Sequence, residues 1–287
     1  MSGPVLNFVS LQHEADGLSA GLPPLMVEAD HLAASVSLGV HGRRRAGMGE
    51  SFWQFRRYGS TDPSSAIDWR ASAKSQHLFV REREWEAAQT VWLWRDASAN
   101  MRFGAPVEKR ARADLLLLAL ASLLVRGGER VGFLGMEGAP AAARIALTRI
   151  GRALFNKNSD DALPPPAPIA RGSHLVWFSD FLDEDVEAVM QGLAHQGITG
   201  HLVRIIDPAE EDFPYAGRAR FEAAGGGDTE IFGRAERVRG AYQARFIAHG
   251  EKIAAAAARL GWSATTHRTD HAPQAALIAL HAAIGGL

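Results

Sequence analysis

The stretch that decides the fold is TVWLWRDASANM, residues 90–101. Its apolar run, with β-branched and aromatic members, is typical of a strand covered on both faces. The run ends at Asp96, which is followed by Ser98 and Asn100. Ligands of open α/β sheets bind where strands leave the sheet, and all three side chains offer hard oxygen atoms of the kind that Mg²⁺ prefers. The alternative is that Asp96 caps the following turn and Ser98 bonds local backbone.

The segments that follow predict an α/β fold with a doubly wound, mostly parallel sheet, because strand-like and helix-like patterns alternate from residue 90 onward. A proline-rich surface loop is expected at 156–171, and an exposed β-hairpin insertion at about 217–234. We expect strands at 91–95, 131–136, 142–147, 174–178, 201–206 and 262–267, and helices at 108–126, 150–155, 183–195, 237–260 and 272–284.

Residues 1–89 differ from the rest and form an expected N-terminal segment, packed on a main domain of residues 90–287. A helix is predicted within 18–37. Residues 41–83 are rich in arginine and aromatic residues. The apolar residues of this segment are too scattered to form a core of their own. Short strands and loops are expected there.

Asp180 follows the predicted strand 174–178 directly, as Asp96 follows strand 91–95. In a doubly wound sheet ordered 3-2-1-4-5-6, strands one and four are neighbours where the winding reverses. With 142–147 as strand three, the two aspartates converge on one crevice. A cation there would relieve the repulsion between the carboxylates, and without one a raised pKa or an arginine partner is required.

The sequence Asp96-Ala-Ser98-Ala-Asn100 resembles the Asp-x-Ser-x-Ser motif of von Willebrand factor A domains, which use these residues in a metal-ion-dependent adhesion site. The resemblance implies the same strand order and a second aspartate where Asp180 stands. Asn100 replaces the second serine of the motif. A completing threonine is not identified, since Thr148 is expected at a helix start, where capping is the more economical role.

Residues that precede Asp96 in the chain point to one family among those with such a motif. The segments RRY (56–58), IDWRASAK (67–74) and LFVRERE (78–84) are similar to the signature of the bacterial family catalogued as domain of unknown function 58. The similarity runs from about residue 39 to residue 201. It implies an intracellular protein that is often paired with a MoxR-type AAA+ ATPase and acts in the assembly, maturation or metal insertion of other proteins.

Within IDWRAS, Asp68 and Arg70 are expected to form a fixed ion pair with Trp69 as a packing anchor. The motif is then either structural or the centre of a protein-binding surface, where tryptophan and arginine often dominate. The residues predicted for this surface are Arg56, Tyr58, Asp68, Trp69, Arg70 and Ser72.

Composition excludes several function classes. The formal net charge is −1, so no global field attracts nucleic acid or membrane. The absence of cysteine excludes disulfides, thiol catalysis and cysteine-based zinc sites. No secretion signal and no apolar run long enough to cross a bilayer are found, which predicts a cytoplasmic protein without membrane insertion.

The favoured function is a non-enzymatic protein-interaction module. Asp96, Ser98, Asn100 and Asp180 would hold Mg²⁺ or Mn²⁺, and a carboxylate of the partner would complete its coordination. The alternative is a Mg²⁺-dependent phosphohydrolase with Asp96 as nucleophile or ligand. No lysine is expected at the crevice to neutralise a phosphate, and Arg95 is expected to point into the layer that covers the sheet.

Nucleic-acid binding through residues 41–83 is the remaining alternative, with arginines on phosphates and aromatic side chains on bases. The competing interpretation is that these arginines pair with Glu82, Glu84 and Glu86 while the aromatic residues bury the segment. We favour the second interpretation.

Overall fold

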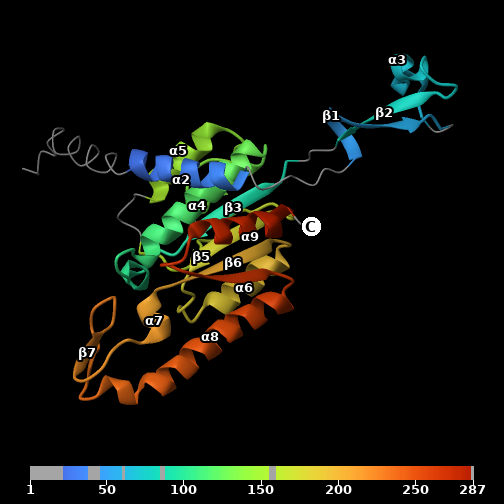
Figure 1. Cartoon of the computed structure of the whole chain (residues 1–287). Helices are drawn as coiled ribbons and strands as arrows, with labels where there is room; N and C mark the ends of the chain where they lie inside the picture. The colour runs from blue at the N-terminus through green and yellow to red at the C-terminus, as the bar shows by residue number, and fades with distance from the viewer. Residues whose placement is uncertain (1–21, 38–45, 60–61, 85–87, 155–159, 286–287) are drawn as a thin grey trace, which may run out of the picture. The chain divides into compact units, whose positions relative to one another are not determined.

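The computed structural model describes residues 22–37, 46–59, 62–84, 88–154 and 160–285. The chain separates into two compact units (Figure 1): residues 1–40 with 89–287, and residues 41–88. Helix α2 (Leu22–Ser37) belongs to the larger unit, where it packs on α4 (Lys109–Arg126). The division after residue 88 lies one residue from the expected boundary, and residues 1–40 group with the larger unit. Packing of 41–83 on the main domain stays a prediction.

A five-stranded parallel sheet forms the centre of the larger unit, and its strand order is β4-β3-β5-β6-β9. Every residue of β5 is buried, as expected for a strand covered on both faces. The winding reverses between β3 and β5, which confirms the doubly wound α/β fold. The strands are β3 (Thr90–Arg95), β4 (Arg130–Phe133), β5 (His174–Ser179), β6 (Thr199–Ile206) and β9 (Ser263–Arg268).

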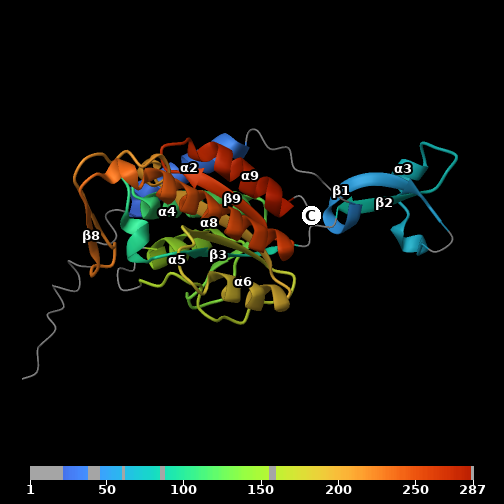
Figure 2. The same ribbon diagram turned by 90° about the horizontal axis from the view of Figure 1, so that it is seen from below.

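Helices cover both faces of this sheet (Figures 1 and 2). Helix α4 is apolar nearly all round because α2, α5 and α9 pack on it while its inner face contacts the strands. Helices α6 and α8 contact each other and belong to the crossovers on the far side of the reversal point. The remaining bounds are α5 (Arg144–Leu154), α6 (Val186–His195), α7 (Pro208–Asp212), α8 (Arg239–Arg259) and α9 (Pro273–Gly285).

The predicted strand 142–147 is wrong. Ala141 makes only an isolated antiparallel bridge to Val131, and the chain turns into α5 at Arg144. The buried residues of α5 include Leu147, Ile150 and Leu154, which repeat every three to four residues as a helix requires. The sheet therefore has five strands instead of six, but β5 still lies beside β3.

The predicted hairpin insertion is confirmed as β7 (Ala219–Glu222) paired antiparallel with β8 (Thr229–Phe232). Gly226 and Gly227 have φ angles of 80° and 109° in its turn, a conformation that favours glycine. A 3-10 turn, η3 (Ala235–Arg237), then leads into α8. Figure 1 shows β7 near α7, at one end of the larger unit.

The smaller unit contains the antiparallel pair β1 (Ala46–Arg57) and β2 (Phe79–Glu84). Between them lie a 3-10 turn, η1 (Ser64–Ala66), and the one-turn helix α3 (Trp69–Ser72). Ile67 and Val80 are buried and joined by an isolated bridge. In neither unit is any described helix both long enough and apolar enough to span a membrane.

Candidate functional site

Asp96 and Asp180 meet at the carboxyl edge of the sheet, as the sequence predicted. Strands β3 and β5 are paired in parallel with Arg95 opposite Phe178, and the amide of Asp96 extends the ladder by donating to the Phe178 carbonyl at 2.9 Å. Both aspartates are buried, with 2% and 4% of their surface exposed. The charge of Asp180 adds to the burial that raises the pKa of Asp96. We refer to this place as the crevice.

Two residues, Ser98 and Ser179, hold the Asp96 carboxylate. The Ser98 backbone N–H donates to Oδ1 at 2.8 Å, and the Ser179 hydroxyl donates to Oδ2 at 2.7 Å. Ser179 in turn accepts from the Phe181 N–H at 2.8 Å. Burial is the largest influence on this carboxyl and raises its pKa, while the hydrogen bonds from Ser179 and Ser98 act against that rise.

The Asp180 carboxylate is in contact with a lysine. Lys109, the first residue of α4, is fully buried, and its Nζ lies 2.9 Å from Asp180 Oδ2 and 2.6 Å from Glu210 Oε1. Leu182 N–H donates to the other Asp180 oxygen at 3.2 Å. Burial lowers the pKa of Lys109, but the charges of Asp180 and Glu210 outweigh it, so the net shift is upward. The side chain is a buried ammonium between two carboxylates.

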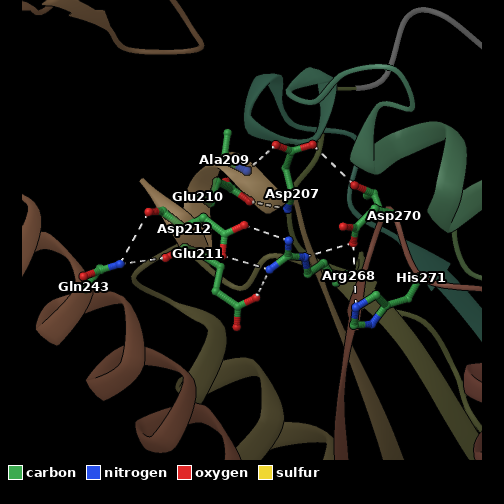
Figure 3. A network of polar contacts seen from close by, with 10 residues as sticks. Asp207, Ala209, Glu210, Glu211, Asp212, Gln243, Arg268, Asp270 and His271 are labelled. Carbon is green, nitrogen blue, oxygen red and sulfur yellow. Dashed lines mark hydrogen bonds and ion pairs between the residues drawn. The ribbon is translucent and has the colours of Figure 1, made fainter. Parts of the chain in front are cut away.

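Glu210 reaches the lysine because α7 begins at a well-formed cap. Asp207 accepts from the Ala209 N–H at 2.8 Å, and Glu210 Oε2 accepts from the Asp207 N–H at 2.8 Å (Figure 3). This is a capping box, which fixes the first turn of a helix. Thr269, just after β9, donates its hydroxyl to Asp207 at 3.3 Å.

Arg268, the last residue of β9, ties α7 to the sheet from the other side (Figure 3). Its guanidinium contacts Asp212 and Glu211 at 2.7 Å, both in α7, and Asp270 at 2.9 Å. Figure 3 shows Gln243 approaching the end of α7 from the opposite side; its amide donates to the Glu211 carbonyl at 3.3 Å. Helix α7 is short and depends on these contacts for its position.

A pocket of about 690 Å³ opens beside the crevice, between the carboxyl edge and the hairpin. Its walls are largely apolar and include six aromatic residues. The ring centroid of Phe213 lies 4.8 Å from that of Tyr242 and 5.7 Å from that of Phe221. The lining residues include Asn100, Phe103, Lys109, Leu182, Glu210, Phe213, Tyr215, Phe221, Phe232, Tyr242 and Arg245. We call it the edge pocket.

The structure brings most of the predicted metal residues together. Asp96 and Ser98 are joined by a hydrogen bond, Asp180 lies in the same crevice, and Asn100, in the 3-10 turn η2 (Ala99–Arg102), lines the edge pocket. Thr148 lies in the middle of α5 and not at a helix start, because the helix begins at Arg144. Metal binding by these residues stays a prediction.

The donor set does not fit that prediction. An ion bound to Asp180 would lie within a few ångströms of the Lys109 ammonium, and at ~4 Å the repulsion would be about 8 kcal/mol, twice the value for two unit charges at an effective dielectric of about 20. Among the described residues, no group of three or more His, Asp or Glu side chains is arranged to hold a metal.

Sequence reasoning missed Lys109, and the expectation that no lysine stands at the crevice is wrong. No local pattern marks Lys109, because a lysine in the first turn of a helix is usually solvated. The available signal was topological, since the helix after β3 must start near the carboxyl edge where β3 ends. Arg95 does point into the covering layer, where it pairs with Asp114 of α4 at 2.8 Å.

In the smaller unit, the IDWRAS motif builds a fold element. Asp68 caps α3 by accepting from the Ala71 N–H at 2.9 Å. The hydroxyl of buried Ser72 donates to the Asp68 carbonyl at 2.7 Å and accepts from the Phe79 N–H at 2.9 Å, which joins α3 to β2. Trp69 is 66% exposed, so the expectation of a packing anchor is wrong. Arg70 is exposed beside it.

Arg56 and Tyr58 both bind Asp62. Two guanidinium nitrogens of Arg56 lie 2.9 Å from the Asp62 carboxylate, and the Tyr58 hydroxyl donates to its carbonyl at 2.9 Å. The hydrogen bond from Arg56 is the main reason that the pKa of Asp62 is lowered to about 2. The expected pairing with Glu82, Glu84 and Glu86 falls on side chains outside those described.

Comparison with known proteins gives matches among curated sequences and among solved structures. Uncharacterized proteins of Mycobacterium tuberculosis and Mycobacterium bovis are each 31% identical over 134 residues, which is 46% of this chain and 40% of theirs. The chain thus matches less than half the length of these curated relatives.

Two solved structures match about 70% of this chain. BatB from Bacteroides thetaiotaomicron, a conserved hypothetical protein, has a TM-score of 0.37 and 14% identity over 69% of this chain and 98% of its own. An aerotolerance-related membrane protein from Bacteroides fragilis, with multiple mutations to serine, has the same TM-score and identity over 70% of this chain and 100% of its own.

The family model described as protein of unknown function DUF58 matches residues 54–252, which is more than half of the chain. The match includes most of the smaller unit and the crevice residues from Asp96 to Glu210. The chain therefore belongs to the DUF58 family.

Proposed function

We propose that this chain is a non-enzymatic protein-interaction module with a von Willebrand factor A-like domain that binds a protein partner at the edge pocket. The observation that carries the proposal is the pocket itself, which has about 690 Å³ of volume and mostly aromatic and aliphatic walls at the carboxyl edge of a doubly wound sheet. This edge is where ligands of such folds bind.

The rim of the edge pocket offers exposed apolar surface. Leu182 is 51% exposed and Phe103 is 39% exposed, and both line the pocket. Large exposed apolar side chains next to an apolar hollow are typical of protein-binding surfaces. Aromatic residues at the centre of such a surface commonly dominate the binding energy.

The crevice supports binding better than catalysis. The Ser179 hydroxyl donates to Asp96 and accepts from backbone, so it is held as a structural donor. The Lys109 ammonium is neutralised by Asp180 and Glu210, which leaves it poorly suited to binding a phosphate. The phosphohydrolase alternative therefore has no specific support from this geometry, and a panel of phosphate ester substrates tests it directly.

As partner we propose a MoxR-type AAA+ ATPase or its client, in the cytoplasm, because the family resemblance implies that pairing. The exposed Trp69 and Arg70 form a second candidate surface, carried by the smaller unit. These residue types often dominate protein interfaces.

The test measures the affinity of the full chain for a purified MoxR-type AAA+ ATPase by calorimetry. We expect Leu182→Ala to raise the dissociation constant by about 10-fold or more, which corresponds to a loss of about 1.4 kcal/mol of binding free energy. The matched control is Ile247→Ala, because Ile247 is 58% exposed on α8 and does not line the edge pocket. Absence of binding by the unmodified chain would overturn the choice of partner. If the two variants bind with equal affinity, the proposal that the partner docks at the edge pocket is wrong.

A further inference from the structure

We propose that Lys109 is the crevice's own cation, standing where a divalent ion would otherwise be held, and that partner binding at the edge pocket is independent of divalent metal. The second half rests on the proposed function. The first half concerns this chain alone and is tested without a partner.

Three separate elements meet at the Lys109 ammonium. The lysine comes from the first turn of α4, Asp180 follows β5, and Glu210 comes from α7, with Nζ–O distances of 2.9 and 2.6 Å. The Phe103 ring lies 5.9 Å from Nζ and adds a cation–π contact. A fully buried ammonium is stable only when it is paired in this way.

The charge count shows why the lysine is needed. Asp96, Asp180 and Glu210 place three carboxyl groups around the crevice, and the first two are at most 4% exposed. Converging carboxylates repel one another unless a cation or a proton is added. Lys109 supplies one positive charge on a side chain that the fold holds in place. A dissolved ion would lose translational freedom on binding the same carboxylates, whereas the attached ammonium does not.

This arrangement also defines the chemistry of the partner. A metal-dependent adhesion site attracts an acidic side chain, which completes the metal's coordination. Here the ammonium already has two carboxylates, so an incoming acid would meet net negative charge. The partner segment that fits the edge pocket is apolar or aromatic, because most of the lining residues are apolar, among them Phe213, Phe221 and Tyr242.

The experiment titrates the full chain with Mg²⁺ and Mn²⁺ and records heat and melting temperature. We expect no saturable binding by the unmodified chain up to about 10 mM ion, which is about ten times the dissociation constant of the weakest calcium sites in proteins. Lys109→Met keeps the length and packing of the side chain but removes its charge. We expect it to gain one Mn²⁺ site, with a melting temperature raised by about 3 °C or more on saturation.

Two controls make the result specific. Lys109→Arg keeps the charge and should bind no metal, and Lys109→Met combined with Asp180→Asn should lose the site gained. Saturable Mn²⁺ binding by the unmodified chain that disappears in Asp96→Asn or Asp180→Asn would overturn the proposal. A folded Lys109→Met variant without metal affinity would overturn it as well. If that variant does not fold, the titration of the unmodified chain and its two asparagine variants decides.

The independence of partner binding from metal is measured separately. The affinity for the ATPase is compared in EDTA and in Mg²⁺, with the nucleotide state held constant. Equal affinity supports metal independence, whereas a loss of about 10-fold or more in EDTA overturns it. A chain that fails to bind the ATPase at all counts against the proposed function, and the metal titration still stands.

Discussion

Buried ionisable side chains at the two edges of the sheet are stabilised in opposite ways. At the carboxyl edge, buried charge is kept and paired around Lys109. Near the amino edge, His174 and His201 stack with ring centroids 5.3 Å apart and share a 3.0 Å contact between ring nitrogens. His201 also contacts the Ser263 hydroxyl at 2.8 Å. Burial lowers the pKa of both histidines, so here the charge is excluded.

This histidine pair predicts a loss of stability in acid. Burial, with a smaller contribution from the charge of His174, lowers the pKa of His201 from 6.5 to about 4 in the folded chain. As pH falls through this window, the unfolded chain takes up a proton that the folded chain does not. The free energy of unfolding therefore decreases, by at most about 1.4 kcal/mol per pH unit for one such group.

Urea unfolding between pH 7 and pH 5 measures this effect. His201→Gln should flatten the slope of unfolding free energy against pH, whatever its effect at pH 7. His195→Gln, at an exposed position on α6, should leave the slope as it is. A His201→Gln slope equal to that of the unmodified chain would contradict the assignment.

At the scale of elements, close packing sets what each strand tolerates. Gly200 in β6 lies under the indole of Trp262, and a Cβ at residue 200 would overlap that ring. The indole cannot move away easily, since it is buried and donates to the Ile198 carbonyl at 3.1 Å. We expect Gly200→Ala to lower the free energy of unfolding by about 1–3 kcal/mol.

Gly192 in α6 is the matched control for Gly200. A Cβ there meets nothing within 4 Å, and its φ is not positive, so Gly192→Ala should be neutral or stabilising by up to about 1 kcal/mol. Both values come from chemical unfolding of the full chain. Equal destabilisation by the two substitutions would show that the indole contact does not limit β6.

The elements also show what sequence alone could predict. Strands β3 and β5 were predictable because each apolar run stops at a polar group, and their adjacency then brought Asp96 to Asp180. Residues 142–147 were misassigned because a short apolar run fits a strand and a helix equally well. The edge pocket was not predictable, since its contacts join Phe213 to Phe221 and Tyr242 across separate elements, and no local pattern specifies that packing.

At the scale of the whole molecule, the chain consists of two units with separate interiors. We therefore expect local changes in residues 41–88 to leave the larger unit unaffected. Ser72→Ala removes the acceptor of the Phe79 N–H and should weaken the smaller unit by about 1–3 kcal/mol. Trp69→Ala should change stability by less than about 0.5 kcal/mol, because the side chain is exposed.

Amide hydrogen exchange distinguishes these outcomes. Ser72→Ala should speed exchange at Phe79 and Val80 without changing the protection of β5 in the larger unit. Trp69→Ala should leave the protection of both regions unchanged. It should weaken the binding of any partner that contacts the smaller unit. Loss of protection in β5 on Ser72→Ala would show that the two units unfold together.

The anchoring of α7 by Arg268 has a consequence for how far the chain can be shortened. Glu210 faces Lys109 only while α7 is held, and its anchors, Arg268 and Thr269, come from the last strand and the residue after it. A fragment that ends before residue 263 retains both aspartates yet loses these ties, and with them the balance of charge around the ammonium. Residues 263–287 are thus required for a charge balance whose groups lie more than fifty residues earlier in the chain.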